Sequence, residues 1–521
     1  MGAGVPTRMC LSWTSSTLCT LRPACVDRWA SVRTRWLAGR TFCTFPREHS
    51  HRPPDTIIVT FRTFGTSISR RLRAPRLAGC ALALGAVSAP AGAQRYRLIT
   101  LDPGHFHASL VQKFMSPDLD SVVHVYAPAG DDLAQHLARV DAFNKRADQP
   151  THWSEVVYSG ADYFNRMLAE RAGNIVTIAG NNAQKTDYIA RAIDARLNVL
   201  ADKPMVVTPA DLGKLKRAFR NAGTRHVLLY DIMTERNEIT NTLQRELSMA
   251  PALFGTLQHG TKDDPAIRME SVHFLSKVVA GIPLRRPQWF FDVRQEGEGL
   301  QDVGTHLIDL VQWEAFPGAT LRESDVVVSG SRRWPTSITP AQFKTVTGAD
   351  RFPDYLAADV KDGALQYYCN GDVSYRIKGV YARAAATWDF EAPPGSGDTH
   401  HSVFRGTKAT LEIKQGAAEH YKPTLYVTPL SPVTADAFES ALNATIASLQ
   451  ARFPGVASRR DGDAWIVSAP AKYDVGHEAH FGQVTSHFLA YLRDGKLPAW
   501  EVPNMLVKYS TLARAYTLSH K

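Results

Sequence analysis

Hydrophobic and polar positions follow two different patterns along the chain. From Arg95 to about residue 230, short apolar runs alternate with longer segments whose apolar positions recur at three- and four-residue spacing. The runs predict strands, and the segments predict helices. We expect strands at 96–101, 122–126, 175–179, 198–201 and 226–230, and helices at 109–115, 161–171, 182–196 and 210–222. This alternation predicts a parallel, doubly wound sheet.

The second pattern begins near residue 231 and is mostly strand-like, with polar and apolar residues alternating. We expect a polar loop at 395–407, which could line a binding site, and helices near the end of the chain. The expected strands are 324–329, 363–369, 373–381, 385–390 and 409–413, and the expected helices are 435–452 and 479–492. The predicted fold class is therefore α/β: a parallel-sheet domain over 94–230, then an α/β domain with an open, largely antiparallel sheet over 231–521. Within the first domain, 131–152 is interpreted as an insertion.

Charge and cysteine are concentrated in the first 93 residues. The chain has a formal charge of +10, and its first 93 residues hold 13 Arg, no Lys and three acids, so the remainder is neutral. The body gives no electrostatic reason to expect a nucleic-acid partner. Cys369 is the single cysteine after the leader, which excludes an internal disulfide or a cysteine zinc site there.

The leader has the order of parts of a bacterial export signal. A basic stretch at 69–73 precedes a short apolar run at 77–87, and Ala91-Gly92-Ala93 follows as a small-residue cleavage site. The run is too short and too weakly apolar to be an integral membrane span. The pair Arg70-Arg71 resembles a twin-arginine signal. We therefore expect a periplasmic or secreted protein cleaved near Ala93, and interpret 1–66 as disordered or as an overextended gene start.

The turn after the first predicted strand is where a dinucleotide's pyrophosphate would rest. A G-x-G-x-x-G pattern is expected there, but Asp102 and His107 occupy the outer glycine positions and Gly104 alone remains. The backbone N–H groups of Gly104, His105 and Phe106 could still bind phosphate. Asp102 brings negative charge close to this turn, and the acid expected directly after the second strand for the ribose is missing.

A glycine-rich turn at 297–299 leads into a predicted helix in which Asp302 and His306 are four residues apart. That spacing places both side chains on one face. A carboxylate beside an imidazole suits proton transfer near neutral pH. Alternatively, Asp302 caps the helix and His306 is a partly buried polar residue.

Three motifs in this order resemble the glucose–fructose oxidoreductase / inositol dehydrogenase family (Gfo/Idh/MocA). They are the turn-to-helix at Gly104, the triplet Asp202-Lys203-Pro204, and Gly297-Glu298-Gly299 followed by Asp302, Gly304, His306 and Asp309. The segment from Asn181 and Asn182 also resembles a helix start of that family. The resemblance covers 95–313 well and is weaker beyond, where the chain is similar to an oxidoreductase subgroup with its own C-terminal region.

The resemblance implies a Rossmann domain that binds NAD or NADP, a small-molecule carbohydrate or polyol substrate, and pairing of subunits into a homo-oligomer. It implies that Lys203 orients cofactor and substrate hydroxyl, that Asp302 assists substrate positioning and proton transfer, and that His306 is the acid/base. Further cofactor contacts are expected from Asn181, Asn182, Asp202, Lys203 and Pro204.

Two more residues are candidate substrate contacts. Arg236 could bind a polyol or carboxylate, or could equally form a helix-start ion pair with Glu235 or Glu238. Trp289 could form a wall beside the nicotinamide or the sugar, or could simply pack. We expect no metal site, because the neighbours His400 and His401 lack a third ligand.

The leading hypothesis is an exported NAD(P)-dependent oxidoreductase that moves hydride between the nicotinamide and a sugar or polyol hydroxyl. One alternative is an NAD-dependent glycoside hydrolase of the same fold. Another is a non-catalytic periplasmic sugar-binding protein whose nucleotide site has decayed, which the altered turn at Gly104 favours.

Overall fold

The computed structural model describes residues 96–279, 282–430 and 434–521. The predicted leader and export signal at 1–93 lie outside the described residues. No helix within the described ranges has both the length and the apolar character needed to cross a membrane.

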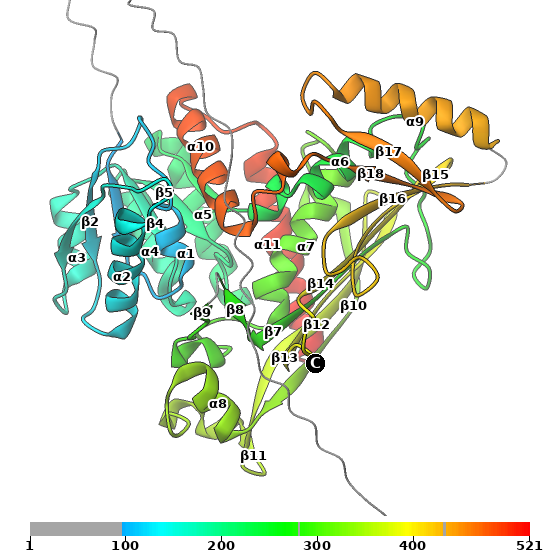
Figure 1. Cartoon of the computed structure of the whole chain (residues 1–521). Coiled ribbons are helices and arrows are strands. Elements are labelled where there is room, and N and C mark those ends of the chain that lie inside the picture. The colour runs from blue at the N-terminus through cyan, green and yellow to red at the C-terminus, as the bar shows by residue number, and fades with distance from the viewer. Residues whose placement is uncertain (1–95, 280–281, 431–433) are drawn as a thin grey trace, which may run out of the picture. The chain divides into compact units, whose positions relative to one another are not determined.

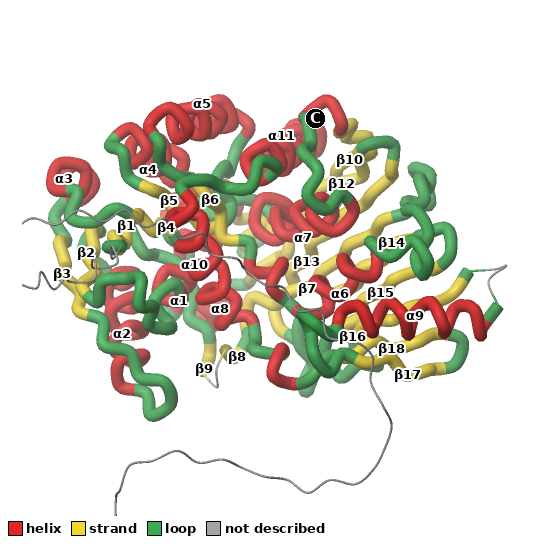
Figure 2. The backbone as a smooth tube through the Cα atoms, turned by 90° about the horizontal axis from the view of Figure 1, so that it is seen from above, coloured by secondary structure: helices red, strands yellow, loops and turns green. Residues whose placement is uncertain are grey.

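The first sheet has six parallel strands in the order β3-β2-β1-β4-β5-β6. It belongs to the blue and cyan part of the described chain (Figure 1). Helices lie on both of its faces, with α3, α4 and α5 on one side and α1 and α2 on the other (Figure 2). The central strands are fully buried and therefore almost entirely apolar. The strands are β1 (Leu98–Leu101), β2 (Val122–Tyr126), β3 (Ser154–Tyr158), β4 (Ile175–Ile178), β5 (Asn198–Asp202) and β6 (Leu229–Ile232).

The crossover helices of this sheet are α1 (His107–Leu110), α2 (Asp131–Lys145), α3 (Tyr163–Glu170), α4 (Lys185–Asp194) and α5 (Pro209–Arg225). The helix expected at 109–115 is shorter and starts earlier. After one α-helical turn the backbone hydrogen bonds change to the 3₁₀ type, from the N–H of Gln112 to the oxygen of Ser109 and from the N–H of Lys113 to the oxygen of Leu110.

The interpretation of 131–152 as an insertion was wrong. This segment contains α2 and leads into β3, which pairs in parallel with β2 and completes one side of the sheet. The sequence signal is weak for a physical reason. β3 is an edge strand without a fully buried residue, and α2 buries only Leu133, His136 and Val140.

The second sheet has ten strands, in the order β10-β12-β13-β7-β14-β15-β16-β18-β17 with β11 on β12. All of its pairs are antiparallel except β7 with β13. The predicted fold class is thus confirmed. The strands are β7 (Ile267–Ser276), β10 (Val326–Ile338), β11 (Val360–Lys361), β12 (Ala364–Ile377), β13 (Val380–Glu391), β14 (Thr399–Arg405), β15 (Ala409–Gln415), β16 (Thr424–Pro429), β17 (Ala457–Asp461) and β18 (Ala464–Ser468); the hairpin β8 (Val278–Val279) and β9 (Ile282–Pro283) is separate.

The polar loop expected at 395–407 was wrong for most of its length, because β14 occupies 399–405. Its inward residues Ser402 and Phe404 are fully buried, while the neighbouring side chains stay partly exposed. Because this strand contains histidines, a serine and an arginine, its polarity does not alternate from residue to residue as the burial of its side chains does.

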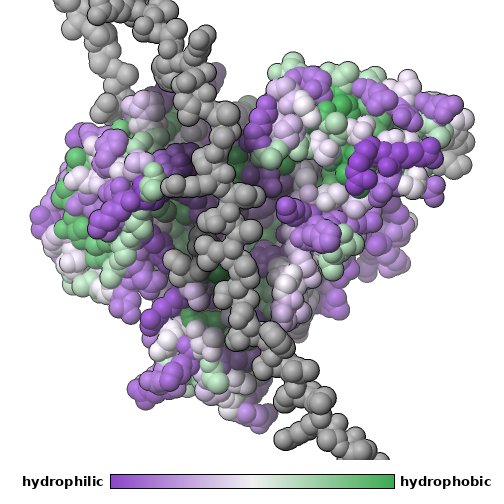
Figure 3. Space-filling model, viewed as in Figure 1, coloured by the Kyte–Doolittle hydropathy of each residue, from purple (hydrophilic) through white to green (hydrophobic). Residues whose placement is uncertain are grey.

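Helices α6, α7 and α11 contact the second sheet, α6 at β15, α7 at β12 and β13, and α11 at β10. The helix α7 also carries the Asp302/His306 motif. The face seen in Figure 3 is largely hydrophilic, with small scattered apolar patches. The helices of this part are α6 (Ile239–Ser248), α7 (Gly299–Ala315), α8 (Pro340–Thr347), α9 (Ala435–Leu449), α10 (His477–Asp494) and α11 (Glu501–Ser519).

Candidate active site

Lys203 and Asp302 form an ion pair between the end of β5 and the first turn of α7. Their side chains are only 9% and 7% exposed. Burial lowers the pKa of Lys203, but the nearby carboxyl groups, Asp302 foremost and Asp202 after it, together outweigh burial, and the pKa of the ammonium lies above its usual value. Burial likewise raises the pKa of Asp302, and Lys203 reverses that shift. Both groups are therefore charged, and the two sequence motifs meet at one point.

His306 lies one turn further along α7. Burial, followed by the charge of Lys203, lowers the pKa of His306 to about 3. Its Nδ1 is buried and has no hydrogen-bond partner among the described residues. The imidazole is thus neutral near pH 7 and has an unused polar atom, which suits hydrogen bonding or proton exchange with a bound ligand.

The turn at Gly104 places two imidazoles beside Asp202. His107 Nδ1 lies 2.8 Å from Asp202 Oδ2, and His105 Nδ1 lies 4.0 Å from the same oxygen. His107 also packs on Phe481 of α10, at 4.5 Å between ring centroids. His107 therefore replaces the glycine of the expected pattern with a side chain that has its own buried partner.

Within the described ranges, His105, His107 and Asp202 are the group whose ligand atoms lie close enough to hold a metal. We assign them instead to a hydrogen-bonded cluster. The carboxylate already binds His107, and the backbone N–H of residue 107 points at His105 Nδ1 across 3.4 Å. Lys185 donates to the backbone oxygen of Asp202 at 2.9 Å and adds positive charge nearby.

The amides of Asn181 and Asn182 bind the segment that precedes α7. Asn181 Nδ2 donates to Gln295 Oε1 at 2.6 Å, and Asn182 Nδ2 donates to the backbone oxygen of Glu296 at 2.8 Å. Both residues were predicted to contact the cofactor, but their side-chain N–H groups link the first domain to the segment that precedes α7. Only the amide atoms not used in these bonds could face a ligand.

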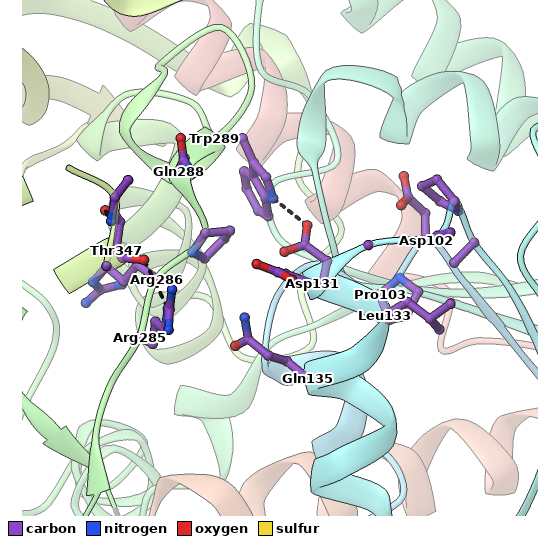
Figure 4. Close-up of a pocket in the computed structure, with 18 of the residues that line it drawn as sticks. Asp102, Pro103, Asp131, Leu133, Gln135, Arg285, Arg286, Gln288, Trp289 and Thr347 are labelled. Atoms are coloured by element: carbon purple, nitrogen blue, oxygen red, sulfur yellow. Dashed lines mark hydrogen bonds between the residues drawn. The ribbon is translucent and has the colours of Figure 1, made fainter. Parts of the chain in front are cut away.

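A pocket of about 390 Å³ opens at the carboxyl ends of β1 and β2 (Figure 4). Trp289 points into it and its indole N–H donates to Asp132 at 2.7 Å. Both side chains crowd Gly104: a Cβ there would lie 2.9 Å from Asp132 Oδ2 and 3.0 Å from the indole ring. Trp289 thus lies over the turn at Gly104. The lining includes Asp102, Pro103, Ala127–Leu133, Gln135, Arg285–Trp289, Thr347–Ala349 and Tyr355.

The position of this pocket fits the nucleoside part of a dinucleotide, which doubly wound sheets bind beyond the carboxyl ends of their strands. Its volume is within the usual range for ligand sites. No acid follows β2 directly, where one is expected to bind the ribose, but Asp131 and Asp132 a few residues later line this pocket. Burial raises the pKa of Asp132, and it raises that of Asp102 to about 6. Because both carboxyl groups lie beside the turn, a bound phosphate is most compatible with their protonated forms.

Arg236 is not brought into contact with this site as a free cation. Its Nε and Nη2 donate to both oxygens of Asp309 at 2.6 and 2.7 Å, and its Nη1 donates to Glu501 at 2.8 Å. Neither partner expected from the sequence, Glu235 or Glu238, forms this pair. A guanidinium with a bidentate partner and a third bond has a structural role, so the assignment of Arg236 as a substrate contact is corrected.

Sequence reasoning missed Glu235, which acts on His306, and two imidazoles beside that carboxylate. Glu235 follows the end of β6, His400 lies on β14, and His477 begins α10. The sequence signal was small: His477 lies just before the helix expected at 479–492, and His400 was considered only for metal binding. Their proximity depends on long-range packing of α10 against the turn at 234–237.

The parallel sheet, the pocket at its carboxyl edge and the buried Lys203–Asp302 pair define a dinucleotide-binding oxidoreductase of two α/β parts. The chain belongs to the Gfo/Idh/MocA family. A family model described as "Oxidoreductase family, NAD-binding Rossmann fold" matches residues 104–230. A second, described as "Putative oxidoreductase C terminal domain", matches residues 243–520. The predicted NAD-binding fold is confirmed.

One solved structure agrees with this membership, and two more distant ones share the fold. A "putative oxidoreductase" from Parabacteroides merdae is 51% identical, covering 82% of this chain and 98% of that one, with a TM-score of 0.80. A second, from Thermotoga maritima, is 12% identical over 82% and 98% of the two chains, with a TM-score of 0.52. Levoglucosan dehydrogenase, solved with NADH and L-sorbose, is 13% identical over 82% and 97%, with a TM-score of 0.53. No curated protein matches the chain.

Proposed function

We propose that this oxidoreductase is NAD(P)-dependent and acts on a hydroxyl group of a sugar or polyol. The observation that carries the proposal is the buried Lys203–Asp302 ion pair one helical turn from the unpartnered imidazole of His306. When bound, the nicotinamide cofactor supplies or accepts the hydride.

The chain's own residues handle the proton and the orientation of the substrate. Lys203, held charged by Asp302, favours negative charge developing on a substrate oxygen. His306, being neutral, can accept the hydroxyl proton or return it in the reverse direction. Its low pKa makes it a weak base alone, so the reaction needs Lys203 to make the hydroxyl more acidic. Asp302 fixes the ammonium and adds an acceptor for a hydroxyl.

The family supports the choice of cofactor, and levoglucosan dehydrogenase, whose structure holds NADH and a sugar, supports the choice of substrate class. The test is to measure NAD and NADP binding calorimetrically with the purified protein, then to follow absorbance at the reduced-nicotinamide band with a panel of sugars and polyols. Binding of neither nucleotide would refute the proposal.

We also propose that the protein is exported, with cleavage near Ala93. The support is the order of basic, apolar and small residues at 69–93. N-terminal sequencing of protein recovered from the periplasm or medium tests this. A mature terminus well before Gln94 would contradict it.

One observation favours a second candidate, a sugar-binding protein without catalysis. Trp289 and Asp132 crowd Gly104 where the pyrophosphate would lie. In this case calorimetry would detect binding of sugars but of neither NAD nor NADP. A W289A variant that gains nucleotide binding would show that the crowding, and not loss of the site, is responsible.

A further inference from the structure

Glu235 lies at the centre of a group of imidazoles close to His306. It is on the short turn 234–237, directly after β6. His477 Nδ1, from the first turn of α10, lies 3.3 Å from Glu235 Oε1. Burial lowers the pKa of His306 and of His400, and the carboxylate of Glu235 acts on both in the opposite direction. Imidazoles from three separate elements, α7, β14 and α10, therefore lie near one carboxylate.

Several polar atoms around Glu235 lack partners. His306 Nδ1, His400 Nε2 and His480 Nδ1 are buried without a hydrogen bond to any described residue. Buried polar atoms are nearly always paired, so unpaired atoms gathered in one place need an explanation such as a ligand. The cluster is also reachable, because the side chains of Glu235 and His477 are 32% and 46% exposed.

The charge of this region does not suit an acidic ligand. Burial raises the pKa of Glu235, but the bond from His477 and the neighbouring imidazoles outweigh it, and the carboxylate stays ionised. Burial lowers the pKa of His306 to about 3 and that of His400 to about 4, so both imidazoles are neutral near pH 7.

Two lysines of this part of the molecule are already paired with carboxylates. Lys203 is paired with Asp302, and Lys277 donates to Asp398 at 2.8 Å. An acidic sugar would thus meet the ionised carboxylate of Glu235 beside lysines that are already paired, whereas a neutral hydroxyl can donate to Glu235.

We propose that Glu235, His400 and His477 form the hydroxyl-binding wall of the substrate site and select neutral sugars or polyols over acidic ones. This inference rests on the proposed function. A carboxylate can accept from two hydroxyl groups, and a neutral imidazole both donates and accepts, so together they match adjacent hydroxyls of one ring. These residues position the substrate, while His306 and Lys203 act on the reacting hydroxyl.

The test compares E235Q with wild type on glucose, galactose and myo-inositol and on glucuronate and galacturonate. Sugar binding is measured calorimetrically with NADH present, and KM and kcat are measured with saturating NAD for each sugar turned over. The amide keeps the shape of Glu235 but loses its charge. We expect the Kd and KM of neutral sugars to rise about 10- to 100-fold with a smaller change in kcat. The preference for glucose over glucuronate should shrink at least about tenfold.

The matched control is E478Q, which removes a carboxylate from the same turn of α10 as His477 but one that is paired with Lys113. It should leave affinities and sugar preference unchanged. If E235Q does not fold, H477Q is the second variant, and it should also weaken the binding of neutral sugars.

The outcomes separate this inference from the proposed function. Absence of nucleotide binding in wild type refutes the proposed function. If nucleotide binds, two results overturn the hydroxyl-wall proposal alone: wild type prefers the uronates, or E235Q and H477Q leave affinity and preference unchanged. A wild type that binds nucleotide but none of the sugars would overturn this proposal together with the sugar or polyol substrate of the proposed function.

Discussion

Lys203 and Asp302 are 99 residues apart in sequence and form one buried ion pair that joins the end of β5 to the start of α7. Removing one member of such a pair leaves an isolated buried charge, which typically costs about 3–5 kcal/mol. The pair therefore has a structural and a proposed catalytic role, and the two can be separated by mutation.

K203M should lower the free energy of unfolding by about 3–5 kcal/mol and abolish turnover. The double variant K203M/D302N, which has no unpaired charge, should recover most of the stability and none of the activity. Urea unfolding followed by circular dichroism and the turnover assay measure the two effects. A stable but active double variant would contradict the catalytic role of Lys203.

H306N should lower kcat by about 10²- to 10⁴-fold, the usual contribution of a general acid–base group. The change in unfolding free energy should be small, since Nδ1 of His306 makes no hydrogen bond to described residues. NAD affinity should stay the same. H487N, at an exposed position on α10, is the control and should keep the wild-type kcat. Unchanged turnover in H306N would refute its role.

R236K should lower stability by about 1–3 kcal/mol, because lysine cannot reproduce the bidentate bond to Asp309. The KM for sugar should not change, since the guanidinium is used by Asp309 and Glu501. Thermal unfolding and substrate titration of the same preparation test this. A large rise in KM without loss of stability would restore Arg236 as a substrate contact.

D102N should change how stability depends on pH. Burial raises the pKa of Asp102 from 3.8 to about 6, so the folded protein holds a proton that the unfolded chain has lost. The wild type therefore loses up to about 2–3 kcal/mol as pH rises from about 4 to 6. D102N should lack this loss and be the more stable protein at pH 7, with no advantage at pH 4.

Urea unfolding at pH 4, 5, 6 and 7 measures that difference. D131N removes an exposed carboxylate from the same pocket and is the control. A constant difference between D102N and wild type across this range would contradict a titrating Asp102.

The sequence predicts the parallel sheet because its buried strands are continuous apolar runs. It does not predict β3 or α2, since an edge strand and a mostly exposed helix bury few side chains. α11, which the sequence analysis did not predict, lies beyond a short turn at 495–500.

The site shows the same limit. The Lys203–Asp302 contact follows from family motifs at a strand end and a helix start. The partners of Arg236 lie 73 and 265 residues away, and no local pattern indicates them. Glu235 and His477 are similarly brought together by packing of a late helix, which periodicity alone cannot predict.

The two sides of the junction between the sheets are held with very different strength. On one side Lys508 of α11 is completely buried between Asp231 and Asp309, 2.7 Å from each, next to Arg236. Separating these groups would leave several charges unpaired. On the other side, beside the pocket, Trp289 and Asp132 share one hydrogen bond. Any domain motion that admits a nucleotide should therefore have its hinge on the α11 side and should open the gap between Trp289 and Asp132.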